Sequence, residues 1–215
     1  MNLIRFAKLI NYSFQYVINT SEIYNIDESH SLKHSMDVFH YANEIYHSEL
    51  AKSEVFLEED KNIIFASAIL HDMCDKKYMD EKESIERLKI YMKDKLKEEE
   101  LDTVCKIIST MSYSTVKKNG YPDLGAHNLA YHIVREADLL AAYDIERCII
   151  YKMKKSNYTY FEAMVEMKGL FENRILQYIP DKLFLTEYSQ KKALELHNHC
   201  IHKLEELDKM YLPKN

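Results

Sequence analysis

The sequence predicts an all-α protein, and three observations carry this prediction. Glycine and proline are rare, because the 215-residue chain contains only three of each, and few turn signals therefore interrupt it. Hydrophobic residues make up 47% and charged residues 30% of the chain, which suits helices with one apolar and one solvated face. Neither an internal repeat nor a linker is evident. We therefore expect a single helical domain over residues 1–215, with its helices packed as a bundle.

The N-terminal segment predicts an amphipathic helix over residues 1–19, packed on the bundle. Its polar residues recur every three to four positions, which distinguishes such a helix from a signal peptide. They are Arg5, Lys8, Asn11, Gln15 and Asn19. No apolar run reaches the roughly 18 residues that a membrane span needs, so we expect no membrane partner.

The third predicted helix has a nearly unbroken apolar body, from Ile63 to Leu70. A helix that is apolar on all sides belongs in the interior, so this one should cross the middle of the bundle and end at His71 and Asp72. The helices around it are expected at about residues 31–51, 80–95 and 98–110.

Residues 111–128 form the longest stretch without a helical pattern and contain two of the three glycines. We expect an irregular loop there, and a loop of this length in a compact domain is more often functional or mobile than a plain connection. The helical pattern resumes at Asn128, and C-terminal helices over residues 158–210 complete the predicted bundle.

Charge and cysteine content exclude some classes of partner. The net charge of −6 speaks against nucleic acid as a partner, because phosphate backbones are bound by basic surfaces. The cysteines are widely spaced and form no CxxC pair; they are Cys74, Cys105, Cys148 and Cys200. Such residues serve as small apolar side chains in the reduced state, and we infer a reducing, cytoplasmic location.

His71 and Asp72 raise the first question of chemistry. They follow directly on the buried helix, where an imidazole and a carboxylate cost several kcal/mol unless they are paired or bind a cation. Neighbouring side chains diverge by about 100° on a regular helix, but at its last turn both can converge on one ion. The dipeptide in this position therefore indicates a metal site.

Two residues on other helices can complete this site. His34 shares a helical face with Val38 and Ala42, and Asp138 lies among apolar residues of another helix. Taken singly, His34 could be a hydrogen-bonded core histidine and Asp138 part of a salt bridge. Two histidines and two carboxylates together are ligands for a single divalent ion, namely Mn²⁺, Co²⁺, Ni²⁺, Fe²⁺, Zn²⁺ or Mg²⁺. We place the core that carries this site at about residues 27–150.

These segments resemble the HD-domain phosphohydrolases, an all-α family with a His, a His-Asp pair and a final Asp on separate helices of a bundle. The segment around His34, the segment AILHDMCDKK and the segment READLLAAYDIER match this pattern. The whole chain is most similar to small stand-alone members of the nucleotide pyrophosphohydrolase type. The resemblance implies a metal-dependent phosphohydrolase of a nucleotide or another small phosphorylated metabolite, and we expect that it can form a homodimer.

The resemblance also implies roles for further residues. Asp75 stands where related hydrolases keep an acidic residue for proton transfer, so that Asp75 and the ligand Asp72 are the expected catalytic residues. Positive side chains would counter phosphate charge, and the candidates for substrate binding are Lys76, Lys77, His30, Arg135 and Arg147.

Three departures from the family pattern keep two alternatives open. Asp37 stands where many relatives have arginine, the segment ISTMSYS lacks a histidine, and Ala141 replaces an acidic residue. One alternative is a regulatory module that binds a metal and a nucleotide without turnover. The other is a di-iron oxygenase on the same scaffold, which would need additional inward histidines.

Overall fold

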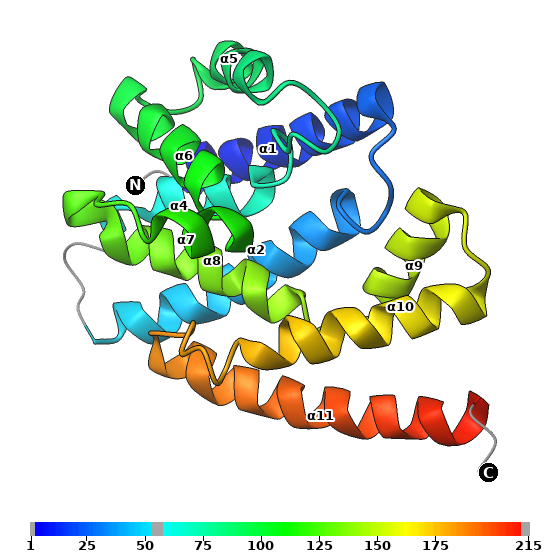
Figure 1. Ribbon diagram of the computed structural model, residues 1–215. Helices are drawn as coiled ribbons and strands as arrows, with labels where there is room; N and C mark the ends of the chain where they lie inside the picture. The colour runs from blue at the N-terminus through cyan, green and yellow to red at the C-terminus, as the bar shows by residue number, and fades with distance from the viewer. Residues whose placement is uncertain (1–2, 53–57, 212–215) are drawn as a thin grey trace. The chain divides into compact units, whose positions relative to one another are not determined.

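Every element in the described part of the chain is a helix, as predicted from the sequence (Figure 1). The computed structural model describes residues 3–52 and 58–211. Contacts within the chain divide it into two compact units, Met1–Asp138 and Leu139–Asn215. The predicted single domain over the whole chain stays a prediction. Within the described residues, no helix combines the length and the apolar character that crossing a membrane would require.

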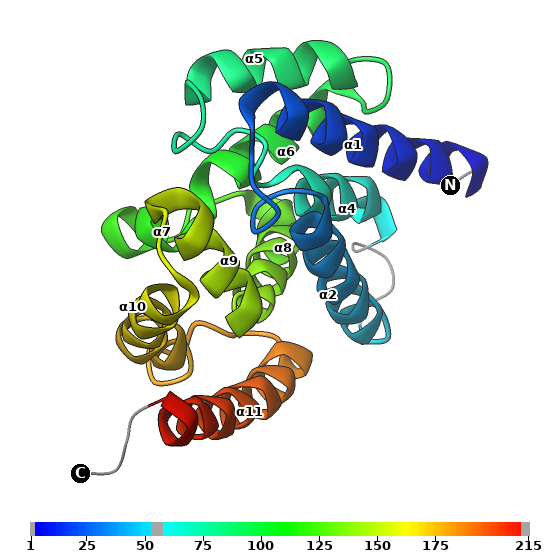
Figure 2. The same cartoon turned by 90° about the vertical axis from the view of Figure 1, so that its right-hand side faces the viewer.

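The first unit is built around α4 (Lys61–Leu70), which packs against α1 (Leu3–Tyr24), α2 (Leu32–Leu50) and α6 (Glu98–Thr110) (Figure 2). All eight residues from Ile63 to Leu70 are buried, so the prediction of a helix in the interior is confirmed. α1 extends five residues beyond the predicted end at residue 19, and the first two residues of that prediction lie outside the described part.

Short polar caps separate the outer helices of this unit. The Asp80 carboxylate accepts a hydrogen bond from the backbone amide of Glu83 at 2.8 Å and begins α5 (Glu81–Met92). The Glu100 carboxylate accepts one from the backbone amide of Lys97 at 2.8 Å at the start of α6. Such bonds satisfy amide groups that have no partner within the helix.

The predicted irregular loop over residues 111–128 was wrong in part. Residues Tyr113–Asn119 form the short helix α7, because the Ser112 hydroxyl caps it by accepting a hydrogen bond from the Thr115 amide at 3.2 Å. Gly120 ends α7 with φ of 75°, a left-handed conformation that glycine adopts without steric cost. The 3₁₀ turn η1 (Gly125–His127) then leads into α8 (Asn128–Ala141).

The second unit contains α9 (Ile145–Ser156), α10 (Tyr160–Asn173), η2 (Ile175–Gln177) and α11 (Glu187–Tyr211), and α10 packs against α9. The last helix begins only at Glu187, within the region of residues 158–210 where C-terminal helices were predicted. Lys182 has a φ of 54°, which lies outside the right-handed helical region and delays the start of the helix. All four cysteines of the chain are buried free thiols, as expected for the reduced state.

Candidate metal centre

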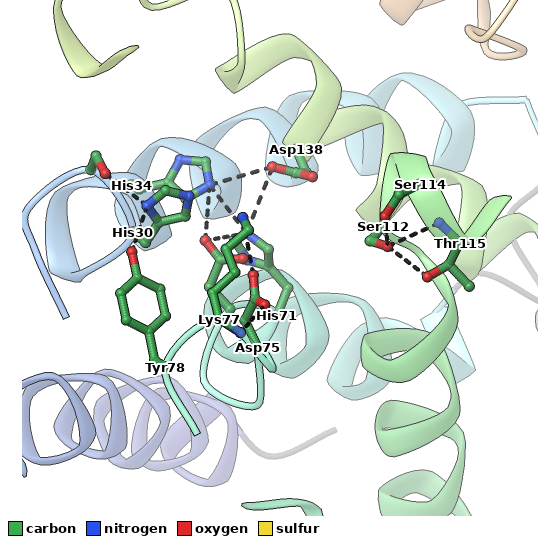
Figure 3. Close-up of polar contacts among 12 residues, drawn as sticks. His30, His34, His71, Asp75, Lys77, Tyr78, Ser112, Ser114, Thr115 and Asp138 are labelled. Atoms are coloured by element: carbon green, nitrogen blue, oxygen red, sulfur yellow. Dashed lines mark hydrogen bonds and ion pairs between the residues drawn. The ribbon is translucent and has the colours of Figure 1, made fainter. Parts of the chain in front are cut away.

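Four side chains from three helical segments meet in the first unit (Figure 3). His34 comes from α2 and Asp138 from α8, while His71 and Asp72 follow the last residue of α4. His34 points inward because it shares a face with Val38 and Ala42, both of which are fully buried. His71 caps the end of α4 and is only 7% exposed. The predicted set therefore comes together in space.

The ligand atoms of these residues lie close to one another. The Nε2 atoms of His34 and His71 are 3.1 Å apart. The Asp72 Oδ2 atom is 3.5 Å from His34 Nε2 and 3.4 Å from His71 Nε2. The Asp138 Oδ1 atom is 3.3 Å from His34 Nε2 and 3.7 Å from His71 Nε2. Both carboxylates thus lie close to the two facing Nε2 atoms.

These separations fit the coordination shell of a divalent ion. Ligand atoms at about 2.1 Å from one ion stand about 3.0 to 3.4 Å apart in octahedral and tetrahedral shells. Direct hydrogen bonds satisfy the cluster poorly, because two facing Nε2 atoms share at most one proton. The Asp72 Oδ2 atom is buried, and none of the described residues donates a hydrogen bond to it. A cation among these atoms would satisfy all of them.

The tautomer of His71 also suits a metal ligand. Its Nδ1 atom lies 2.9 Å from the backbone carbonyl oxygen of Ala68, and a carbonyl oxygen only accepts hydrogen bonds. The Nδ1 atom therefore carries a proton, and in the neutral ring the lone pair is on Nε2, which faces the cluster. The backbone at the end of α4 thereby orients this imidazole.

The electrostatics of the cluster favour a positive charge. Burial disfavours the charged form of His71, but the carboxylates of Asp72 and Asp138 outweigh burial and raise the pKa of His71 to about 9. Burial opposes ionisation of Asp72 and Asp138, yet the neighbouring histidines hold the pKa of both carboxyl groups below the usual range. Two ionised carboxylates within a mostly buried cluster attract either an imidazolium proton or a metal cation.

The segment after α4 holds the predicted catalytic Asp75 and two predicted phosphate contacts. Asp75 is half-buried, and its carboxylate lies 3.2 Å from the Lys77 Nζ atom and accepts a hydrogen bond from the Lys77 amide at 2.9 Å. Lys76 is exposed. Asp75 and Lys77 both belong to the segment that follows His71, and Figure 3 draws them in the same close-up. Their location near the cluster agrees with the predicted roles, which stay predictions.

The two predicted arginines lie in different surroundings. Arg135 is only 1% exposed, and its guanidinium group lies over the Tyr121 ring at 4.8 Å from the centroid. This packing is what a buried arginine in a helical core commonly provides. Arg147 belongs to the second unit, where its backbone amide donates to the Asp144 carboxylate at 3.0 Å. Substrate binding by either residue stays a prediction.

His30 lies next to the cluster, and it is held by residues that the sequence analysis missed. Its ring centroid is 6.3 Å from that of His34. The Tyr78 hydroxyl lies 3.2 Å from His30 Nδ1 and donates a hydrogen bond to Asp27 at 2.9 Å. The signal available in the sequence was the pair Asp27 and Ser29, because aspartate followed two residues later by serine favours a local turn. Nothing in the sequence indicated Tyr78.

Within the described residues, His34, His71 and Asp72 are the only group of at least three His, Cys, Asp or Glu side chains whose ligand atoms all lie within 4.8 Å of one another. The histidines of α11, namely His197, His199 and His202, belong to no such group among the described residues. There, the Cys200 thiol instead donates to the Tyr143 carbonyl oxygen at 3.2 Å.

Comparison with known proteins gives one match. The family model described as HD domain matches residues 31–143, which is just over half of the chain and includes all four residues of the cluster. No curated protein and no solved structure matches the chain.

Proposed function

The chain belongs to the HD domain family, whose members are generally metal-dependent hydrolases, and we propose that it is a metal-dependent phosphohydrolase. The proposed substrate is a nucleotide or another small phosphorylated metabolite. Nucleoside triphosphates, with release of pyrophosphate, are the first substrates to test.

The spacing of the four ligand atoms carries this proposal. The Nε2 atoms of His34 and His71 lie 3.1 Å apart, and each lies 3.3 to 3.7 Å from a carboxylate oxygen of Asp72 and of Asp138. Such a mixed set suits Mn²⁺, Co²⁺, Ni²⁺, Fe²⁺, Zn²⁺ or Mg²⁺. A divalent ion bound there would polarise a phosphoryl oxygen and lower the pKa of a coordinated water.

The chain's own residues provide charge and proton acceptors around this point. Asp138 has 28% of its side chain exposed, so the cluster opens to solvent on the side of this carboxylate. The exposed Lys76 and the partly exposed Lys77 can approach the oxygens of a phosphate group, which is how much of the charge in phosphoryl transfer is stabilised. Asp75 is the nearby carboxylate proposed to accept a proton, and its pair with Lys77 orients it.

The test is a substrate panel with matched variants. Metal-stripped protein would be supplied with each of the six ions and with nucleoside triphosphates, monophosphates and guanosine tetraphosphate, and release of phosphate and pyrophosphate would be measured. The His71→Ala variant removes a ligand, whereas His127→Ala removes a histidine that pairs with Asp60 outside the cluster.

Metal-dependent release by the wild type and by His127→Ala, but not by His71→Ala, would support the proposal, and the product would identify the bond. If the wild type releases nothing with any ion while nucleotides still raise its Tm, the chain is a regulatory module instead and the proposal fails.

A further inference from the structure

A cavity of about 330 Å³ lies between α1 and α5 in the first unit. The two helices lie beside each other in both Figure 1 and Figure 2. Tyr16, Thr20 and Ile23 share one face of α1 and line one wall, and Arg87 and Ile90 of α5 line the facing wall. Pockets for small organic ligands measure about 300 to 1,000 Å³, so this cavity is large enough for one.

Long side chains bridge the two helices around this cavity. The ring centroids of Tyr16 and Tyr91 are 4.9 Å apart. The guanidinium carbon of Arg87 lies 4.8 Å from the centroid of the Tyr24 ring. The Tyr91 hydroxyl donates a hydrogen bond to the Tyr12 carbonyl oxygen at 3.4 Å. These contacts hold α1 and α5 together and leave the space between them open.

The walls of the cavity expose apolar surface to water. Ile90 is 76% exposed and Ile23 is 73% exposed, one on each helix. A single exposed isoleucine is common on protein surfaces, but here two of them line the same concave surface. A ligand that covers both removes apolar area from water, which is favourable in proportion to that area.

The charge of the cavity is positive. Arg87 is the only charged side chain among the described residues that line it. Arg87 is half-buried and donates to the Ser84 hydroxyl at 3.2 Å, and no carboxylate of the described residues pairs with it. Burial raises the pKa of Tyr16 to about 12, so that this phenol stays neutral and does not cancel the positive charge. The planar guanidinium fork matches two oxygens of one anionic group.

We propose that this cavity binds a small aromatic anion, whose ring covers Ile23 and Ile90 and whose negative group pairs with Arg87. Carboxylate, sulfonate and phosphate groups all have the chemistry required. The described residues that line the cavity come from α1, α5 and the turn before α5. The site is therefore separate from the metal cluster, and the inference does not rest on the proposed phosphohydrolase function.

The rival occupant is a second copy of the chain, which would cover the same isoleucines. In a two-fold dimer the same patch occurs on both sides of the interface. The second copy would thus bring another Arg87, and the described lining residues include no carboxylate that could pair with either arginine. Charge complementarity favours the small anion.

Two fluorescent probes with the same ring skeleton test the role of charge. Anilinonaphthalene sulfonate is an aromatic anion, and phenylnaphthylamine is its neutral counterpart. We expect Arg87→Gln to weaken binding of the sulfonate at least about 10-fold, which corresponds to the loss of one charge-assisted hydrogen bond. Its affinity for the neutral probe should equal that of the wild type. Lys82→Gln is the matched control, because Lys82 is exposed on α5 outside the cavity, and it should bind both probes as the wild type does.

A second pair of variants tests the site without changing Arg87. Ile90→Asp and Ile90→Asn alter an exposed position, so the fold should tolerate both. They remove the same apolar contact, but only the aspartate repels an anion and offers Arg87 a competing carboxylate. Ile90→Asp should therefore weaken binding of the sulfonate more than Ile90→Asn does. Equal sulfonate affinities in this pair, or in the wild type and Arg87→Gln, would overturn the proposal.

Methyl NMR of the isoleucine side chains locates the bound probe. The signals of Ile23 and Ile90, assigned by Ile→Val variants, should shift when the sulfonate is added. The signal of Ile150, which is 37% exposed on α9, should stay in place. Shifts that leave out Ile23 and Ile90 would overturn the proposal. Shifts of these two signals with protein concentration alone would also overturn it, because a second copy would then cover this face.

Discussion

The two ends of α4 carry the same residue types and do different things with them. At the N-terminal end, the buried Asp60 carboxylate accepts a hydrogen bond from His127 Nδ1 at 2.7 Å. At the C-terminal end, His71 and Asp72 meet His34 and Asp138. The two Nε2 atoms are 3.1 Å apart, and each is 3.3 to 3.7 Å from an oxygen of both carboxylates. One histidine and one aspartate satisfy each other directly. Two of each, converging from separate segments, leave lone pairs that only a cation can satisfy together.

This difference teaches that a histidine beside an aspartate is no sign of a metal site by itself. Whether such residues can form a metal site depends on the number of ligand atoms that converge and on the distances between them. A contact of 2.7 Å is a direct hydrogen bond, whereas distances near 3.4 Å between several donors are those across a coordination shell. The pair at the first end fastens η1 to α4, and the cluster at the second end is the candidate for chemistry.

The largest expected effect concerns metal binding at the second end. Saturating Mn²⁺, at about 100 times its Kd, should stabilise the wild type by about 2.7 kcal/mol, because an ion that binds only the folded state shifts unfolding by mass action. His71→Ala should lose this stabilisation, since it removes a ligand, and His127→Ala should keep it. Thermal unfolding with and without the ion measures both. Equal stabilisation of the wild type and His71→Ala would mean that the ion binds elsewhere, and the two ends of α4 would then not differ in metal binding.

The second prediction concerns the first end. His127→Ala should lower the free energy of unfolding by about 1 to 2 kcal/mol, because it leaves the buried Asp60 carboxylate without this hydrogen bond. The His127 side chain is 39% exposed, so water entering its place should limit the loss. Urea unfolding at neutral pH measures it. His199→Ala, at an exposed position of α11, is the control. If both variants lose the same free energy of unfolding, the hydrogen bond between His127 and Asp60 contributes nothing specific.

A third histidine, His132, shows how a neighbouring charge changes the pKa of a buried imidazole. His132 lies in α8 with the Tyr121 ring at 5.0 Å and the Arg135 charge nearby. Burial and that positive charge lower the pKa of His132 to about 4, whereas the carboxylates beside His71 raise its pKa. The neutral form of His132 is therefore the one that the folded state retains.

The sign of the pH dependence follows from this lowered pKa. Below the unfolded value of 6.5, the unfolded chain binds a proton at His132 before the folded chain does, so stability falls as the pH drops towards about 4. The His132→Phe variant lacks this proton and should show a shallower fall. Tm measured at pH 7, 6 and 5 for both proteins tests this, with His199→Phe as the control. A slope in His132→Phe as steep as in the wild type would contradict the assignment.

The sequence predicted the centre of the fold better than its connections. The uniform apolar character of Ile63–Leu70 indicated a buried α4, and the helical spacing of His34 with Val38 indicated that this imidazole points inward. Both are local patterns. The structure brings together the predicted cluster, and its role in binding a metal is the proposal tested above.

The remaining features depend on contacts that a local pattern cannot show. Tyr78 meets Asp27 across 51 positions of the chain, and such a contact exists only once α1, α2 and α4 have packed. α7 was missed because its polar residues carry no apolar stripe, and a single capping hydroxyl at Ser112 decides its start. The delayed start of α11 depends on the backbone conformation of Lys182, which is an uncommon one for lysine.

The smallest expected effect tests a departure from the family pattern. In the sequence analysis, Asp37 is a departure from the pattern of the HD-domain phosphohydrolases, and the structure pairs it with Lys33 at 2.5 Å, one turn earlier on α2. The Lys33 side chain is 69% exposed, and exposed pairs at this spacing contribute only about 0.3 to 0.5 kcal/mol. Lys33→Ala should therefore change the free energy of unfolding by no more than about 0.5 kcal/mol and leave Mn²⁺ binding intact. Urea unfolding and metal titration measure these two quantities. A weaker metal affinity in Lys33→Ala would mean that the exposed face of α2 acts on His34, one position further along the helix, and that the departure at Asp37 reaches the centre itself.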